Sequence, residues 1–259
     1  MWPIPETISC HAPADTRIYA VGDIHGCDGL LAELQGRILA DAAEAPESRK
    51  LLVFLGDYVD RGPESAAVIE RLRRGPPAGF EAVFLMGNHE DLMLKFLADP
   101  AAGRLWLRNG GRETAASYGV SAADIRHGGA AELGKLGTMR QALNASLPAA
   151  HRAFLENLLP VHREGDYVFA HAGIRPGVPL AEQSVDDLVW IREPFLSSPD
   201  DHGVVVVHGH TPIDAAEFRF NRINVDTGAV WTGRLTALVL HGGERRLLQT
   251  GAVQDGRVC

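Results

Sequence analysis

The stretch Leu-Leu-Val-Phe-Leu-Gly-Asp-Tyr-Val-Asp-Arg-Gly at residues 51–62 joins an apolar run of strand length to a turn that carries two aspartates and an arginine. Four other short apolar runs also end in Asp, His or Asn beside a glycine: Gly22-Asp23-Ile24-His25-Gly26, Gly87-Asn88-His89-Glu90, His171-Ala172-Gly173 and His208-Gly209-His210-Thr211. Open α/β folds bind ligands at the carboxyl ends of their strands. The repeated pattern therefore predicts one site built from all five segments.

Strand-like and helix-like segments alternate through the first part of the chain. Apolar runs at 17–21, 50–55 and 81–86 are separated by helical patterns around 30–45 and 64–74. This order indicates a β-α-β-α-β arrangement that builds half of the site.

The middle of the chain is predicted to be mainly helical. The clearer helices are 91–97 and 139–159, with a glycine-rich interruption at 128–137, and specificity elements are expected there. The strand pattern then returns at 167–170, 204–207, 223–225 and 235–240.

Composition is typical of an ordinary enzyme. With 259 residues, 46% of them hydrophobic, the chain can bury a sizeable core, and we expect residues 1–259 to form a single domain. A net charge of -8 argues against a general nucleic-acid surface. Apolar stretches are only of strand length and residues 1–13 lack a signal-peptide pattern, so we expect no membrane association and a cytoplasmic location.

The side chains at the strand ends offer metal ligands of mixed type. One residue separates Asp23 from His25, so both can face the same point in an extended or tightly turning segment. Oxygen donors come from Asp57 and Asn88, and nitrogen donors from His171 and His210. This mixture suits Mn, Fe or Zn better than Ca or a soft metal. Two ions sharing one carboxylate would clamp a phosphoryl group and activate a water as the nucleophile.

Together these segments resemble the phosphoprotein phosphatase family of calcineurin-like metallophosphoesterases, and most of all its short bacterial and bacteriophage serine/threonine phosphatases. The resemblance runs from about residue 17 to residue 240. It implies an α/β (α+β) fold, with a central β-sandwich of two mixed sheets flanked by helices. It also implies a hydrolase with two divalent ions, Mn first and Fe or Zn as alternatives.

The resemblance assigns a role to each matching residue. Asp23, His25 and Asp57 would hold the first metal, and Asp57, Asn88, His171 and His210 the second, with Asp57 as the bridge. His89 matches the general acid, Asp60 the carboxylate that orients it, and Arg61 a phosphate clamp. Two ionised aspartates and two divalent ions leave a positive pocket within an acidic protein.

Three features allow more than one interpretation. Arg192, in Val189-Trp190-Ile191-Arg192-Glu193, matches a second phosphate-binding arginine, although a surface ion pair is the competing interpretation. Residues 106–112, which include Asn109-Gly110-Gly111, either line the cleft or form a turn. His208 either supports a ligand or packs in the core.

Departures from the wider superfamily favour the phosphatase branch. After His210 come Thr211 and Pro212, where many nucleases and phosphodiesterases have a second histidine. No regulatory subunit can be inferred, because the docking elements of eukaryotic relatives are missing.

We therefore predict a phosphomonoesterase acting on phosphoserine and phosphothreonine in proteins, with activity on phosphotyrosine or small phosphoesters left open. The alternative is a symmetrical dinucleoside polyphosphate (diadenosine tetraphosphate) hydrolase. A non-catalytic metal-holding interaction domain ranks last, since His89, Asp60 and Arg61 are all present.

Overall fold

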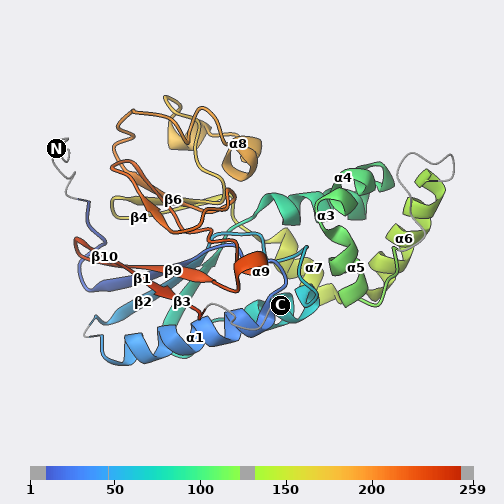
Figure 1. The fold of residues 1–259 in the computed structure, drawn as a ribbon, viewed down its shortest axis with the longest axis horizontal. Helices are drawn as coiled ribbons and strands as arrows, with labels where there is room; N and C mark the ends of the chain where they lie inside the picture. Colours follow the sequence, from blue (N-terminus) through green and yellow to red (C-terminus); the bar gives the residue numbers. More distant parts are fainter. Residues whose placement is uncertain (1–9, 46, 123–131, 252–259) are drawn as a thin grey trace.

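Two five-stranded sheets form the centre of the computed structural model, which describes residues 10–45, 47–122 and 132–251 (Figure 1). The first sheet has the order β10-β9-β1-β2-β3. Its strands are β1 (Thr16–Val21), β2 (Arg49–Phe54), β3 (Phe80–Phe84), β9 (Thr236–His241) and β10 (Glu244–Gln249). Because β1, β2 and β3 are parallel, their carboxyl ends lie at one edge.

The second sheet has the order β4-β5-β6-β8-β7. Its strands are β4 (Val161–Glu164), β5 (Tyr167–Ala170), β6 (Val205–His208), β7 (Glu217–Phe218) and β8 (Arg222–Asn224). The central strands β5, β6 and β8 are parallel, whereas β4 and β7 pair antiparallel at the edges. Both sheets are therefore mixed, as predicted.

Alternate residues of each inner strand enter two different cores. In β1, Ile18 and Ala20 pack between the sheets with residues of β5, β6 and β8, whereas Tyr19 and Val21 face the helices. The same alternation continues in β2. Strands buried on both faces read as continuous apolar runs, which explains the pattern around residues 51–55.

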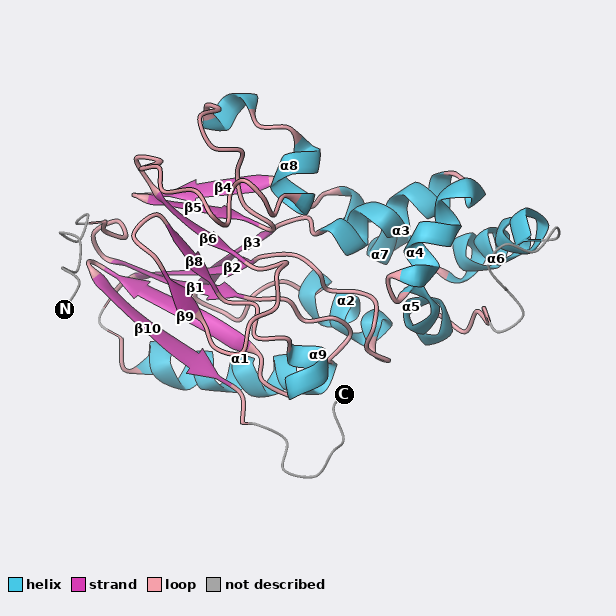
Figure 2. Ribbon diagram, turned by 45° about the horizontal axis from the view of Figure 1, so that its top comes forward, coloured by secondary structure: helices cyan, strands magenta, loops and turns pink. Residues whose placement is uncertain are grey.

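Helices cover the outer faces of both sheets (Figure 2). Those packed on the first sheet or extending beyond its end are α1 (Asp28–Ala43), α2 (Ser65–Arg73), α3 (Asn88–Ala98), α4 (Gly103–Arg108), α5 (Gly111–Ser117), α6 (Glu132–Ser146) and α7 (Ala149–Glu156). The short α8 (Val185–Trp190) packs on the second sheet, α9 (Ala229–Thr232) precedes β9, and single 3₁₀ turns occupy Pro100–Ala102 and Leu180–Glu182.

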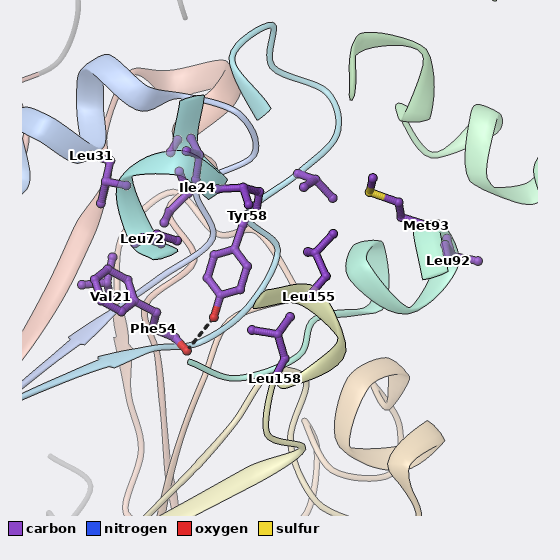
Figure 3. Packing of buried hydrophobic residues seen from close by; sticks show 14 of the residues in the cluster. Val21, Ile24, Leu31, Phe54, Tyr58, Leu72, Leu92, Met93, Leu155 and Leu158 are labelled. Atoms are coloured by element: carbon purple, nitrogen blue, oxygen red, sulfur yellow. Dashed lines mark hydrogen bonds between the residues drawn. The ribbon is translucent and has the colours of Figure 1, made fainter. Parts of the chain in front are cut away.

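The helical core reaches the residues that follow β2. Figure 3 shows the ring of Tyr58 surrounded by aliphatic side chains from several elements, including Ile24, Leu72 and Leu155. Its hydroxyl donates to the carbonyl oxygens of Leu85 (2.7 Å) and Phe54 (3.2 Å). The ring anchors the turn that carries Asp57 and Asp60.

The predicted strands and most predicted helices are confirmed, with end positions that agree to within three residues. The pattern missed β4, β7 and β10, which are short or edge strands with polar residues. A continuous helix over 139–159 is wrong: Pro148 separates α6 from α7, since proline cannot donate the next helical hydrogen bond.

The predicted glycine-rich interruption at 128–137 is also wrong where it can be compared. Helix α6 begins at Glu132 and continues through Gly134 and Gly137, while residues 128–131 lie outside the described residues. Burial of Leu136, Met139 and Leu143 against the helical core outweighs the low helix propensity of glycine. Among the described helices, none combines the length and apolarity needed to span a membrane.

Candidate active site

Loops that follow parallel strands of both sheets bring the predicted site residues together. Asp23 and His25 follow β1, Asp57 follows β2, Asn88 begins α3 after β3, His171 follows β5, and His210 follows β6. We call these residues the donor cluster. All are buried. His25, Asp57 and His210 have positive φ angles (48°, 53° and 65°), a conformation that costs energy and is common where side chains must be aimed at a site.

Asp57 lies at the centre of the donor cluster. Its Oδ1 is 3.4 Å from His171 Nε2, and its Oδ2 is 3.6 Å from His25 Nε2 and 3.8 Å from His89 Nε2. Burial alone would raise the pKa of Asp57, but the surrounding histidines hold it well below its usual value. The carboxylate is therefore an ionised group that faces both halves of the cluster.

Two histidines are oriented by backbone carbonyls. His25 Nδ1 donates to the oxygen of Val59 (3.0 Å) and His171 Nδ1 donates to the oxygen of Leu55 (2.9 Å). In the neutral ring each bond leaves Nε2 without a proton, within 3.6 Å of an Asp57 oxygen in His25 and 3.4 Å in His171. Histidine metal ligands commonly have this arrangement, with one ring nitrogen tied to an acceptor and the other free to coordinate.

Asn88 brings a further oxygen into the same space. Its Oδ1 lies 3.0 Å from His171 Nε2 and 2.8 Å from His210 Nδ1. Because His171 Nδ1 donates to Leu55, Nε2 of the neutral ring is an acceptor. It therefore faces a second acceptor, Asn88 Oδ1. A cation bound by both atoms would remove this repulsion.

The donor geometry fits metal ions. In two groups of described residues the potential ligand atoms all lie within 4.8 Å of one another: His25, Asp57 and His89, and Asp57, His171 and His210. Asp57 belongs to both, as expected of a bridging carboxylate. The Nε2 atoms of His89 and His210 are buried without a hydrogen-bond partner among the described residues. The mixed oxygen and nitrogen set is one that divalent transition metals favour.

Asp23 is linked to the cluster through His210 but belongs to neither of the two groups within 4.8 Å. The backbone N–H of His210 donates to Asp23 Oδ2 (3.1 Å). Burial, followed by the nearby Asp226 and Asp57 carboxylates, raises the pKa of Asp23 well above its usual value. Three buried carboxylates in proximity are costly unless cations neutralise them, so this grouping also fits a metal centre.

His89 and Asp60 form a buried pair, which we call the acid pair. His89 Nδ1 lies 2.8 Å from Asp60 Oδ2, and both side chains are fully buried. Burial tends to lower the pKa of His89, but Asp57 and Asp60 outweigh it, and the pKa is raised. The imidazole therefore retains a proton more readily than a free histidine.

The two arginines differ in their surroundings. Arg61 is half-buried, donates from Nη1 to His25 Nε2 (2.5 Å) and lies over the ring of Trp231, 5.0 Å from its centroid. Arg192 is exposed just after α8, and its charge helps to lower the pKa of His210, although burial is the larger cause. The structure thus puts Arg61 against the donor cluster and Arg192 at its rim.

Sequence reasoning missed Glu90, which connects two site loops. Its carboxylate accepts backbone N–H groups from Asp57 (2.9 Å), Tyr58 (2.8 Å), Val59 (3.1 Å) and Gly87 (3.0 Å). Burial raises the pKa of Glu90 to about 7. An acidic residue next to a histidine at a strand end was the available signal, but its partners are backbone atoms that no motif reveals.

The other open interpretations now have structural answers. His208 donates from Nδ1 to the oxygen of Gly209 (3.1 Å) and packs on Phe195, with 5.1 Å between ring centroids, so its contacts favour the core. Trp106 is fully buried and donates to Asp60 (3.1 Å). Residues 106–112 therefore lie behind the acid pair and do more than form a turn.

A model of the family described as calcineurin-like phosphoesterase matches residues 16–242. The chain belongs to this family. Calcineurin-like phosphoesterases are metal-dependent hydrolases of phosphoesters, and the two mixed sheets flanked by helices agree with their fold. Recognition of the family from the five sequence segments is thus confirmed.

Named relatives of this phosphoesterase include enzymes with different substrates. Bis(5'-nucleosyl)-tetraphosphatase PrpE (asymmetrical) of Anoxybacillus flavithermus is 30% identical over 236 residues, covering 84% of this chain and 88% of the relative. Serine/threonine-protein phosphatase 1 of Salmonella typhimurium is 31% identical over 227 residues, covering 85% and 89%.

A crystal structure of a candidate diadenosine tetraphosphatase has a TM-score of 0.59 at 23% identity, covering 93% of this chain and 99% of that one. At this identity the likeness supports the fold alone.

Proposed function

We propose that this hydrolase is a phosphomonoesterase that removes phosphate from phosphoserine and phosphothreonine in proteins. The observation that carries the proposal is the acid pair, in which His89 Nδ1 and Asp60 Oδ2 lie 2.8 Å apart in full burial. A serine or threonine alkoxide is a poor leaving group and needs a proton as the P–O bond breaks. A nucleotide leaving group ends in phosphate and needs this help much less.

In this proposal the donor cluster holds two divalent ions. Asp23, His25 and Asp57 would hold the first ion, and Asp57, Asn88, His171 and His210 would hold the second, with manganese as the proposed metal. When bound, the ions supply charge neutralisation and a water of lowered pKa. The His25 Nε2 lone pair cannot serve both a metal and Arg61. With His25 as a metal ligand, the Arg61 guanidinium would be available to hold phosphate oxygens.

Proton transfer is the task of the acid pair. The proton on His89 Nε2 passes to the leaving oxygen. The proton on Nδ1 stays there and remains hydrogen-bonded to Asp60. A water oxygen bonds to phosphorus as the ester P–O bond breaks, and phosphate is the second product. The electron pair of the broken bond stays with the alcohol oxygen, which takes the His89 proton and leaves as serine or threonine. Arg192, at the rim, is proposed to contact the same phosphate. The whole chain is proposed to work as one domain, which the core shared by the two sheets supports.

Nearby cations give little support for a long polyphosphate. Arg104 pairs with Glu132 (2.6 Å), and Arg112 donates to the carbonyl oxygen of Ala122. A hollow of about 400 Å³ is lined by Asp91, Asp186, Lys95 and Trp190, whose ring centroid is 6.1 Å from that of His210. Lys95, the one cation among the described residues of its lining, is paired with Asp91 (2.7 Å), so the charged lining is net acidic. Carboxylates repel an extended polyanion, whereas a mixed polar and apolar wall suits a peptide beside the phosphorylated residue.

A second candidate function is hydrolysis of dinucleoside tetraphosphates. The PrpE relative is named as the asymmetrical form, whereas the alternative raised from the sequence is the symmetrical form. Trp231 favours this candidate, because its ring is 54% exposed beside Arg61 and offers a stacking surface for a nucleobase.

A substrate panel with Mn tests the choice. The values of kcat/KM for a phosphoserine peptide, p-nitrophenyl phosphate and diadenosine tetraphosphate are compared at equal metal and salt, since both affect anionic substrates. We expect the phosphomonoesters to have the higher kcat/KM. The opposite result would be a tenfold preference for the dinucleotide. If Trp231→Ala, or Ala substitution at Arg104, Arg108 or Arg112, selectively removes that preference, the second proposal replaces the first.

A further inference from the structure

Asp60 is held by more groups than the acid pair alone requires. One carboxylate oxygen, Oδ2, faces His89 Nδ1. The other, Oδ1, accepts from the indole Nε1–H of Trp106 (3.1 Å) and from the hydroxyl of Thr114 (2.6 Å). All four side chains are fully buried. With two donors on Oδ1, the carboxylate cannot rotate without breaking hydrogen bonds that no water can replace.

The backbone at Asp60 is also held by hydrogen bonds, some of them from the same segment. Asp60 and Arg61 have positive φ angles of 72° and 68°, a conformation that is uncommon for non-glycine residues and is less unfavourable for aspartate than for arginine. The N–H of Asp60 donates to Thr114 Oγ1 (2.7 Å) and Ser65 Oγ (3.1 Å), and the N–H of Arg61 donates to the oxygen of Gly110 (3.2 Å). One helical segment therefore contacts both the carboxylate and the strained turn.

The glycine pair in this segment permits the close approach. A Cβ atom at Gly110, where φ is 104°, would lie 2.6 Å from the nitrogen of Arg61. A Cβ atom at Gly111 would lie 2.4 Å from the ring of Trp106. Trp106 also stacks on Phe96, with 4.9 Å between ring centroids, so its indole is held in one orientation. We call Trp106, Gly110, Gly111 and Thr114 the brace.

We infer that Trp106 and Thr114 are positioning residues for proton transfer, because they fix Asp60 so that it holds His89 with Nε2 directed toward the phosphate site. The inference rests on the proposed function, in which His89 protonates the leaving oxygen. Neither residue contacts the donor cluster in the described contacts, so each acts through Asp60. Loss of a brace donor should weaken proton delivery and leave metal binding intact.

The test is the leaving-group dependence of the Mn-loaded full chain carrying Trp106→Phe or Thr114→Val. Each change removes one donor to Asp60 Oδ1. Thr114→Val conserves volume but also removes the acceptor of the Asp60 N–H, whereas Trp106→Phe keeps an aromatic ring but is smaller than the indole. Loss of a hydrogen bond to a charged group predicts that kcat for a phosphoserine peptide falls about tenfold. The kcat for p-nitrophenyl phosphate, whose leaving oxygen needs little protonation, should change less than about twofold, with KM and bound Mn unchanged.

Two matched variants separate positioning from stability. Thr114→Ser keeps the hydroxyl and should restore the wild-type ratio of the two substrates. Tyr118→Phe removes a hydroxyl that contacts His151 Nδ1 (2.9 Å) near the end of the same helix, α5, and should not alter that ratio. Equal losses on both substrates in Trp106→Phe and Thr114→Val would overturn the inference and leave a purely structural role.

The double variant Trp106→Phe/His89→Asn distinguishes failure of the positioning role from failure of the proposed function. If the brace acts through His89, Trp106→Phe should cause no further loss in the His89→Asn background. Additive losses would overturn the positioning role while the acid role of His89 stands. If His89→Asn itself leaves the leaving-group dependence unchanged, His89 is not the general acid. The proposed function and the positioning role are then both contradicted.

Discussion

The donor cluster and the acid pair are neighbouring buried groups that are held in place by different means. Two histidines of the donor cluster are oriented by backbone carbonyls of the segment that follows β2, His25 by Val59 and His171 by Leu55. The acid pair is oriented by side chains of the helical layer, Trp106 and Thr114. Since the supports are separate, a substitution in the helical layer can change proton transfer without changing metal binding.

Asp57→Asn is the strongest test of the donor cluster. The carboxylate faces both candidate metal groups, and metal ions contribute several kcal/mol to such reactions, so we expect at least about a 10³-fold loss of turnover. Mn content, measured after gel filtration, should fall in parallel. Full turnover after exhaustive chelation of the wild-type protein would contradict the two-metal proposal.

His89→Asn tests whether the acid pair is separable from the donor cluster. Turnover of a phosphoserine peptide should fall by about 10²- to 10⁴-fold, the usual contribution of general acid catalysis. Hydrolysis of p-nitrophenyl phosphate should fall much less, and most of the Mn should stay bound. Loss of metal together with activity would instead make His89 a ligand, as its place in one candidate metal group allows.

Glu90→Gln perturbs the connection between the loops after β2 and β3. The carboxylate accepts four backbone N–H groups, and an amide would turn its NH₂ toward two of them. Leaving buried donors unsatisfied should reduce the free energy of unfolding by about 1–3 kcal/mol. Urea unfolding in the presence of chelator measures this change. Glu33→Gln, at a half-exposed site on α1, is the control and should change it by less than about 0.5 kcal/mol.

The two arginines should respond differently to Lys substitution. Arg61→Lys should lower kcat/KM about tenfold, because lysine cannot reproduce the bidentate fork or the stacking on Trp231. Arg192→Lys should lower it only about two- to threefold, since the residue is exposed and its charge is screened. Both variants are compared by kcat/KM and by the inhibition constant for phosphate. Equal changes in the two variants would contradict the distinction between an inner and a rim arginine.

Much of the donor cluster could be predicted because strand ends and short loops are local features. An apolar run followed by Gly56-Asp57 places an aspartate at a sheet edge wherever the strand forms, and five such segments fit one metal chemistry. Register and burial then bring the atoms to within 4.8 Å, a convergence that only the packed sheets supply.

The brace could not be predicted in the same way. Trp106 and Thr114 lie 46 and 54 residues after Asp60, and helical periodicity says only that such residues face a core. The helix predicted through Pro148 failed for a different reason: the proline is a local signal in the sequence, and the prediction gave it too little weight against the helical pattern around it. Contacts between distant helices depend on packing, which sequence spacing does not encode.

By itself the sequence determined the family, the alternating strands and helices, and the residue types that meet at the sheet edge, because these follow from local patterning and residue chemistry. Only the tertiary structure decided the partners: Glu90 on four backbone groups, Trp106 and Thr114 on Asp60, and Arg61 between His25 and Trp231. The physical reason is that buried polar groups must find hydrogen-bond partners, and the folded chain brings those partners from segments far apart in sequence.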